Sequence, residues 1–246
     1  MEKIIRSLLI RILGFPQYLR LVSHIYLRLV FAGFLRKKYP ELFHLSQLIK
    51  PGFVCIDIGA NVGYYSSFMS KYAGPSGHIY AVEPVSLFAE IFAANTKRFG
   101  IGNITLHQTA LGGTDGEVIM GTPVIQGVVR HGLTRVLDAS ETAGMRTYKV
   151  PLQVPDKLFA NLQQLDFIKC DVEGYEVHLF PHLMQTIHRF RPLIQVEIST
   201  LENRRILFDL FSSENYKIAR LNEGKLIVMN PEEALNYNTG DFYLLP

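Results

Sequence analysis

From Phe53 onward, short apolar and β-branched runs alternate with stretches in which apolar residues recur at helical spacing. This alternation predicts a mostly parallel sheet with helices on both faces. Later runs near the C-terminus suit antiparallel strands that close the sheet. We therefore expect a doubly wound α/β domain with a mostly parallel, seven-stranded sheet. The expected strands cover residues 53–58, 78–82, 104–110, 166–171, 193–198, 216–221, 226–229 and 242–245.

The first fifty residues follow a different pattern, in which basic residues interrupt apolar stretches at regular intervals. Residues 1–38 carry eight basic side chains and one acidic side chain, a net charge of +7, whereas the rest of the chain has a net charge of −4. We expect residues 1–50 to form a basic, amphipathic helical extension and residues 51–246 to form the α/β domain. The extension has two interpretations: docking on an anionic membrane surface, or packing as helices on the domain or on a second subunit. Packing is the commoner use of such a pattern.

The composition bears on where the protein acts and on its partners. No apolar run in residues 1–50 reaches the length of about 18 residues that a spanning helix needs, and no cleavage site follows a clean apolar stretch. Cys55 and Cys170 lie in apolar runs and are too few for a disulfide scaffold, which favours a reducing compartment. We expect a cytoplasmic protein, with contact to the inner face of the membrane through residues 1–38 as the alternative. The mildly acidic α/β part does not favour nucleic-acid binding, and the oligomeric state stays open.

A glycine-containing turn follows the first expected strand, in the run from Asp57 to Gly63. Glycines there let the backbone turn sharply and approach a ligand closely. A dinucleotide fold would have GxGxxG, but Asn61 replaces the second glycine and Ser66 stands where the last is sought. A carboxylate at Asp57 would repel a pyrophosphate, whereas it can accept hydrogen bonds from the ammonium group of a methionine moiety. The charge favours S-adenosylmethionine (SAM) over NAD.

Glu83 ends the second expected strand, where its carboxylate is placed to accept both hydroxyls of a ribose. Such a residue supports an adenosine ligand without separating a methyltransferase from a nucleotide-dependent oxidoreductase.

The second group of acidic residues lies in and around the run from Asp166 to Glu176. An apolar strand delivers Asp171 to the carboxyl edge of the sheet, where ligands collect in open α/β folds. Glu173 is expected to start the next helix, and Glu197 reaches the same edge from the neighbouring strand. Asp171 and Glu197 could together hold Mg²⁺, but no further oxygen ligand can be assigned, so a metal is not favoured.

These blocks together resemble the FkbM family of SAM-dependent methyltransferases, over roughly residues 50–246. The resemblance rests on the turn from Asp57 to Gly63 and on five further blocks in family order: Glu83-Pro84, Ala110–Gly112, Asp166–Glu176, Arg191–Glu197 and Phe242–Pro246. It implies a class I methyltransferase sheet and transfer of a methyl group to hydroxyls of sugars, glycolipids or related small molecules.

The resemblance also implies roles for individual residues. The expected SAM-binding residues are Asp57, Gly59, Ala60, Asn61, Gly63, Glu83 and Ala110. Asp171 and Glu173 would line the methyl-transfer site, with Asp171 as first candidate for the base or for orienting the acceptor. Glu197 is a further catalytic candidate, although a structural hydrogen bond explains it equally well. Apart from the resemblance, residues 112–150 are rich in glycine and threonine without clear periodicity, and we expect a hairpin and a mobile loop near the site there. In this region His131 and Arg130 could contact the acceptor.

Two other functions stay open at this point. A nucleotide-dependent oxidoreductase is disfavoured by Asp57 and Asn61, and a non-catalytic SAM-fold binding module is disfavoured by Asp171 and Glu173.

Overall fold

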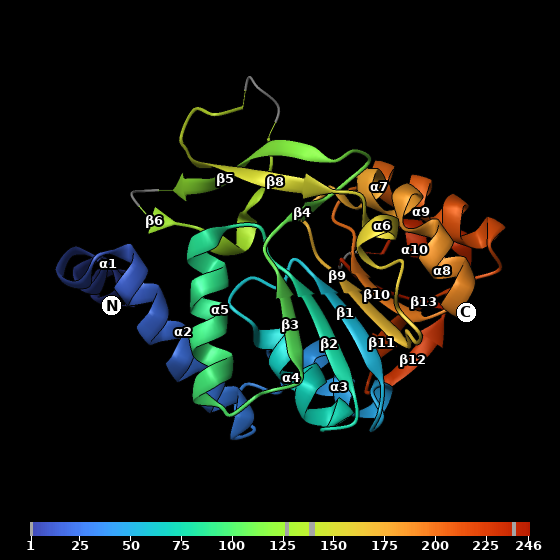
Figure 1. Ribbon diagram of the computed structural model, residues 1–246, viewed down its shortest axis with the longest axis horizontal. Coiled ribbons are helices and arrows are strands. Elements are labelled where there is room, and N and C mark those ends of the chain that lie inside the picture. The colour runs from blue at the N-terminus through green and yellow to red at the C-terminus, as the bar shows by residue number, and fades with distance from the viewer. Residues whose placement is uncertain (1, 126–127, 138–140, 238–239) are drawn as a thin grey trace.

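The computed structural model describes residues 2–125, 128–137, 141–237 and 240–246, and its centre is a sheet of eight strands (Figure 1). Across the sheet the strand order is β12-β11-β13-β10-β9-β1-β2-β3. Each run expected as a strand forms one, and the run 104–110 divides into β3 and a short strand β4. The strands of the main sheet are β1 (Val54–Ile58), β2 (His78–Val82), β3 (Ile104–His107), β9 (Phe167–Cys170), β10 (Leu193–Glu197), β11 (Lys217–Asn222), β12 (Lys225–Val228) and β13 (Asp241–Leu245).

Strand direction explains why the acidic residues meet. The strands β3, β2, β1, β9 and β10 are parallel, and β13, β11 and β12 complete the sheet with antiparallel pairings. In this register Ile58 pairs with both Val82 and Cys170, so the residues that follow β1, β2 and β9 emerge at one edge. We expected a sheet of seven strands, and the structure has eight, because β12, the expected run 226–229, also joins the sheet through a hairpin with β11.

Helices cover both faces of the main sheet (Figure 1). Because side chains alternate along a strand, Cys55 packs in a cluster with α3 and α4, whereas Ile56 packs in a cluster with α7, α8 and α9. Cys55 and Cys170 are both buried and free, as their apolar surroundings predicted. The helices are α1 (Glu2–Leu13), α2 (Phe15–Phe31), α3 (Pro40–Leu48), α4 (Tyr64–Ala73), α5 (Ser86–Arg98), α6 (Pro155–Leu158), α7 (Glu176–Leu179), α8 (Met184–Phe190), α9 (Leu201–Ser213) and α10 (Pro231–Leu235), with short 3-10 turns at His131–Leu133 and Phe180–His182.

A second, smaller sheet lies above the carboxyl edge of the main sheet in Figure 1. The sequence predicted a hairpin and a mobile loop in region 112–150, and β5 and β8 form a long antiparallel hairpin there. Parts of the expected loop, residues 126–127 and 138–140, lie outside the described residues. The strands of this sheet are β4 (Ala110–Leu111), β5 (Gly116–Ile125), β6 (Val128–Val129), β7 (Arg135–Val136) and β8 (Met145–Gln153).

The N-terminal extension is helical, and α2 packs against α5. One side of α2 is buried, with Leu19, Leu27 and Val30 almost fully covered. An ion pair of 2.7 Å between Arg20 and Glu90 links the two helices at the surface. Packing on the domain is therefore confirmed for this helix. Among the described residues, no helix is both long and apolar enough to cross a membrane.

Candidate functional site

A cavity of about 350 Å³ opens at the carboxyl edge of β1, β2 and β9. Its walls come from the loops after these strands, from the β5 side of the smaller sheet, and from Tyr39 of the N-terminal extension. Six of the seven expected SAM-binding residues line it, together with two of the three expected catalytic residues. The exceptions are Gly63 and Glu197. The predicted residues that line the cavity are Asp57, Gly59, Ala60, Asn61, Glu83, Ala110, Asp171 and Glu173.

The two glycines of the first turn are required by contacts within the protein. Gly59 has φ +81°, and a Cβ there would lie 1.9 Å from the carbonyl oxygen of Asp171. Gly63 has φ +92°, and a Cβ there would lie 2.9 Å from a ring carbon of Phe92. L side chains rarely adopt such φ values, and an added Cβ would also clash at each position. Both positions therefore require glycine for two separate reasons. We expected these glycines to let the backbone approach a ligand closely. In the structure they also let β1 lie close to β9 and α4 lie close to α5.

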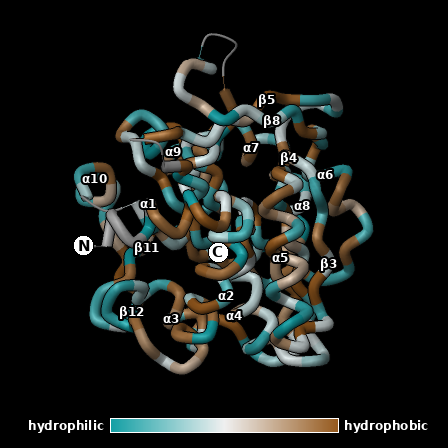
Figure 2. Tube along the Cα trace, turned by 90° about the vertical axis from the view of Figure 1, so that its left-hand side faces the viewer, coloured by the Kyte–Doolittle hydropathy of each residue, from teal (hydrophilic) through white to brown (hydrophobic). Residues whose placement is uncertain are grey.

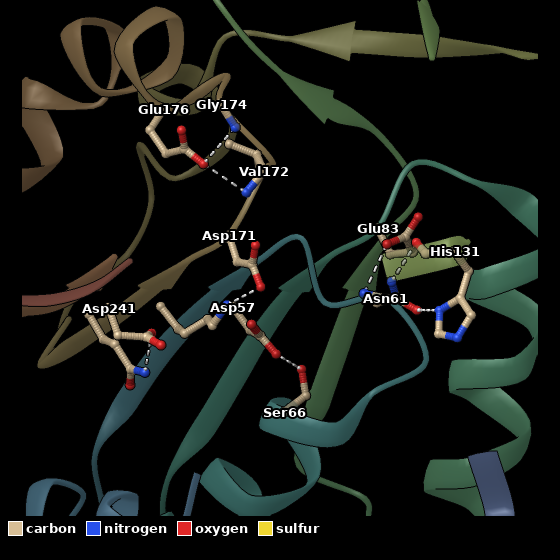
Figure 3. A network of polar contacts seen from close by, with 12 residues as sticks. Asp57, Asn61, Ser66, Glu83, His131, Asp171, Val172, Gly174, Glu176 and Asp241 are labelled. Carbon is tan, nitrogen blue, oxygen red and sulfur yellow. Dashed lines mark hydrogen bonds and ion pairs between the residues drawn. The ribbon is translucent and has the colours of Figure 1, made fainter. Parts of the chain in front are cut away.

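Asp57 closes the floor of the cavity. Its side chain is 1% exposed, and Oδ2 accepts a hydrogen bond of 2.5 Å from the Ser66 hydroxyl (Figure 3). Within the described part of the chain, Oδ1 has no hydrogen-bond partner. Burial raises the pKa of Asp57, and the positive charge of Lys169 opposes that shift. A buried acceptor without a partner fits a ligand that brings a donor, as the ammonium group of SAM would.

Glu83 holds the glycine turn in place from the end of β2. Its Oε2 accepts from the backbone N–H of Asn61 at 2.9 Å (Figure 3), and its Oε1 accepts from Val85 N–H at 2.8 Å. Burial raises the pKa of Glu83 to about 7, although these two hydrogen bonds favour the charged form. Each carboxylate oxygen can accept a second hydrogen bond, so the expected ribose contacts would add to those seen.

His131 reaches the same turn from the smaller sheet. Its Nδ1 lies 3.1 Å from Asn61 Oδ1, and Asn61 Nδ2 donates to the His131 carbonyl oxygen at 3.2 Å. Burial, with a smaller effect from the charge of Arg6, lowers the pKa of His131 to about 4. The histidine therefore lines the cavity in its neutral form. Ala110, on β4, is buried and lines the same cavity.

Asp171 forms an ion pair with a lysine that sequence reasoning missed. Lys169 Nζ lies 2.7 Å from Asp171 Oδ2, and 4.7 Å from the centre of the Tyr65 ring. Burial acts to lower the pKa of Lys169, but the charges of Asp171 and Asp57 outweigh it and raise the pKa above its usual value. The signal was present in the sequence, since a lysine inside an apolar strand needs a buried partner.

We expected Glu173 at the start of a helix, but it lies in a tight turn with φ +53°. The helix α7 begins at Glu176, whose Oε1 accepts from the backbone N–H groups of Val172 and Gly174 and so holds that turn (Figure 3). The dipole of α7 therefore does not explain why an acidic residue stands at position 173. Burial and the charges of Asp171 and Glu197 raise the pKa of Glu173 to about 8.

Glu197 ends β10 and is not among the described residues that line the cavity. Burial and the charges of Asp171 and Asp241 raise its pKa to about 7. Asp241 opposes Glu197 across the antiparallel pair of β10 and β13 and was not singled out from the sequence. Across residues 2–125, 128–137, 141–237 and 240–246, no cluster of three or more His, Cys, Asp or Glu is arranged to hold a metal ion.

Comparison with solved structures supports the fold. An FkbM methyltransferase from Methylobacillus flagellatus superposes with a TM-score of 0.50 at 14% sequence identity, over 80% of this chain and 48% of that chain. At this identity the likeness concerns the fold alone.

Two curated relatives match shorter segments. A protein-L-isoaspartate O-methyltransferase from Methanosarcina mazei is 40% identical over 66 residues, which are 27% of this chain and 26% of that protein. The corresponding protein from Methanothrix thermoacetophila is 29% identical over 58 residues, 24% of this chain and 28% of that protein. The chain thus spans about a quarter of the length of these relatives.

The model of the FkbM methyltransferase domain matches residues 57–218, from the carboxylate on the cavity floor to β11. This segment contains each of the expected site residues and covers well over half of the chain. The chain therefore belongs to the FkbM methyltransferase domain family, with the fold of class I SAM-dependent methyltransferases and SAM as its cofactor.

Proposed function

We propose that this protein transfers the methyl group of SAM to a hydroxyl oxygen of a sugar, a glycolipid or a related small molecule. The observation that carries the proposal is the cavity at the carboxyl edge, in which Asp57 and Glu83 lie on the side of the glycine turn and Asp171 and Glu173 on the side of β9. One group suits an adenosine-containing ligand, and the other suits a hydroxyl that must lose a proton. The protein would act in the cytoplasm, without a nucleic-acid partner.

The residues of the glycine turn would bind SAM. The free Oδ1 of Asp57 would accept from its ammonium group, and Glu83 would accept from its ribose hydroxyls. The walls beside them would enclose the rest of the ligand. The residues proposed for this wall are Gly59, Ala60, Asn61 and Ala110, while Gly63 would act indirectly through the packing of α4 on α5.

The carboxylates after β9 would orient the acceptor and remove its proton. Bound SAM supplies an electrophilic methyl group; as the acceptor oxygen bonds to it, the bond from methyl to sulfur breaks and the hydroxyl proton must leave. Asp171, oriented by Lys169, would align the hydroxyl or take this proton. Glu173 is the alternative base, because a pKa of about 8 lies close to the working pH of such a group. Glu197 would act on both through its charge.

The test is transfer of labelled methyl from SAM into an extract of the source cells, separated into lipid, glycan and small-molecule fractions. Label in a base-stable ether of the glycan or lipid fraction would support the proposal. Asp171→Asn or Glu173→Gln should then reduce turnover by about 100-fold, the lower range for a lost general base, with SAM affinity retained. Label in protein carboxyl esters or in nucleic acid, with none in those fractions, would contradict the proposed acceptor.

A second arm concerns the metal. EDTA should leave turnover unchanged if a carboxylate acts as the base, whereas loss that Mg²⁺ restores would assign Asp171 to a metal site.

A further inference from the structure

Exposed apolar side chains are concentrated on the N-terminal extension. Within the described residues, eight of the sixteen large apolar side chains that face solvent fall in residues 8–35. Figure 2 views the molecule from the side on which α1 lies. Exposed apolar side chains that are grouped in one segment indicate a contact with another surface, and we call this group the patch. Its members are Leu8, Ile12, Leu13, Leu21, Ile25, Leu29, Phe34 and Leu35.

The helix α2 has two apolar sides, of which the domain covers one. Leu21, Ile25 and Leu29 follow one another at four-residue spacing and are 43%, 47% and 42% exposed. The opposite side, which includes Leu19 and Leu27, packs against the domain. A surface helix of a globular domain ordinarily has one apolar stripe. Core packing therefore explains the buried side of α2 and leaves the stripe of Leu21, Ile25 and Leu29 without a role.

The charge around the patch indicates what would cover it. Residues 3–40 contain no acidic residue, so the patch lies in an entirely basic segment. A second copy bound through the same patch would bring like charges together, because both partners of a two-fold interface present the same surface. Anionic phospholipids provide an apolar layer beneath a negative surface, which matches apolar and basic side chains together. The exposed basic residues are Arg11, Arg28, Arg36, Lys37 and Lys38.

We propose that this N-terminal surface, residues 8–38, docks on the anionic surface of a lipid bilayer and lies in its interface. The end of the surface leads directly into Tyr39, whose side chain lines the cavity. Docking would therefore bring the bilayer next to the segment that forms one wall of the site. Docking itself needs no methyl transfer, whereas the acceptor class that it implies, a hydroxyl on a lipid-anchored molecule, rests on the proposed function.

The experiment measures partition of the full-length protein onto vesicles of phosphatidylcholine alone and of phosphatidylcholine mixed with phosphatidylglycerol. Deleting the extension would uncover the core beneath α2, so point variants are preferable. The apolar test pair is Ile25→Gln with Leu29→Gln. Its matched control is Leu201→Gln with Ile206→Gln on α9, at 46% and 47% exposure.

A second pair tests the charge. Arg28→Gln with Lys37→Gln removes two exposed cations of the surface, and Arg205→Gln with Lys217→Gln removes two exposed cations elsewhere. We expect the apolar pair to lower the partition coefficient by about tenfold or more, and the charge pair to lower it about tenfold on the mixed vesicles. High salt should act like the charge pair, and both control pairs should bind as the unmodified protein does.

Three results would overturn the proposal. The first is that the unmodified protein does not bind mixed vesicles, and the second is that the test and control pairs lower the partition coefficient equally. The third is that the unmodified protein sediments as a dimer, which the apolar substitutions dissociate, and does not bind vesicles. SAM affinity, measured in the same variants by calorimetry, should not change. A protein that binds vesicles but neither binds SAM nor transfers methyl would refute the proposed function and leave the docking surface intact.

Discussion

Lys169, near the end of β9, and Asp171, two residues further along the chain, form an ion pair of 2.7 Å. The side chain of the lysine is 3% exposed. Asp57 and Asp241 also act on this lysine through their charges. A single buried cation thus balances several carboxylates around the cavity. Because desolvating a charge is costly unless it is paired, the lysine and its acidic neighbours depend on one another for stability.

Replacing Lys169 with Met should therefore destabilise the protein. We expect the free energy of unfolding to fall by about 3 kcal/mol, the lower part of the range for breaking a buried pair, because Asp171 is partly exposed. Urea unfolding followed by circular dichroism measures it. The double variant with Asp171→Asn removes the unpaired partner and should recover part of the loss. A single variant as stable as the unmodified protein would mean that the lysine charge is not needed.

The strands along the chain and the edge at which the acids meet could be predicted from the sequence, because apolar runs and turn residues are local signals. The positions of Asp57, Glu83 and Asp171 followed from that edge alone. Lys169 and Tyr39 were missed for different reasons. Lys169 interrupts an apolar run that we took as purely structural, and Tyr39 reaches the cavity through tertiary packing of the extension, which periodicity cannot report.

Gly59→Ala should be far more damaging than an ordinary glycine substitution. The added methyl group would meet the carbonyl oxygen of Asp171 at 1.9 Å, so β1 and β9 would have to move apart. We expect a loss of at least ~3 kcal/mol of unfolding free energy, within the range for steric strain in a core. Gly100→Ala, at the end of α5, is the matched control, with φ +66° and no atom within 4 Å of the new Cβ. It should cost about 1 kcal/mol, and equal losses would rule out the clash.

The stability of the protein should depend on the protonation of Glu173 between pH 4.5 and about 8. Its pKa rises from 4.5 unfolded to about 8 folded, so between these values the folded state binds more protons. The free energy of unfolding therefore falls as pH rises through this window. Relative to Glu173→Gln, the unmodified protein should lose ~2 kcal/mol between pH 5 and 9, after discounting for partial exposure. The histidines titrate in both proteins, so their contribution cancels in the difference between the two free energies of unfolding. A difference that does not change with pH would contradict the raised pKa of Glu173.

What could not be predicted is how many contacts one carboxylate makes. Glu83 was expected to face a ribose, but it also holds the backbone of Asn61 and Val85. The sequence shows an acid at a strand end, while the path of the following loop decides which backbone groups reach it.

This double role of Glu83 leads to a test that separates its two parts. In Glu83→Gln the amide NH₂ would face a backbone N–H, so one of the two hydrogen bonds from Asn61 and Val85 is lost. The free energy of unfolding should fall by ~1–3 kcal/mol, the cost of an unsatisfied buried group. SAM affinity should fall about 10–100-fold if the carboxylate also accepts from the ribose. Glu90→Gln, on the exposed side of α5, should alter neither quantity by a comparable amount.

The deciding quantity is the ratio of the affinities for SAM and for its analogue without the ribose 2′-hydroxyl, measured by calorimetry in both proteins. If Glu83 accepts from that hydroxyl, the unmodified protein should prefer SAM by about tenfold, the value of one charge-assisted hydrogen bond. The preference should then shrink in Glu83→Gln, because the contact that distinguishes the two ligands has been weakened. If Glu83 only supports the glycine turn, both ligands lose the same affinity and the ratio stays constant. A constant ratio would therefore assign Glu83 to the loop and leave the ribose to other groups of the cavity wall.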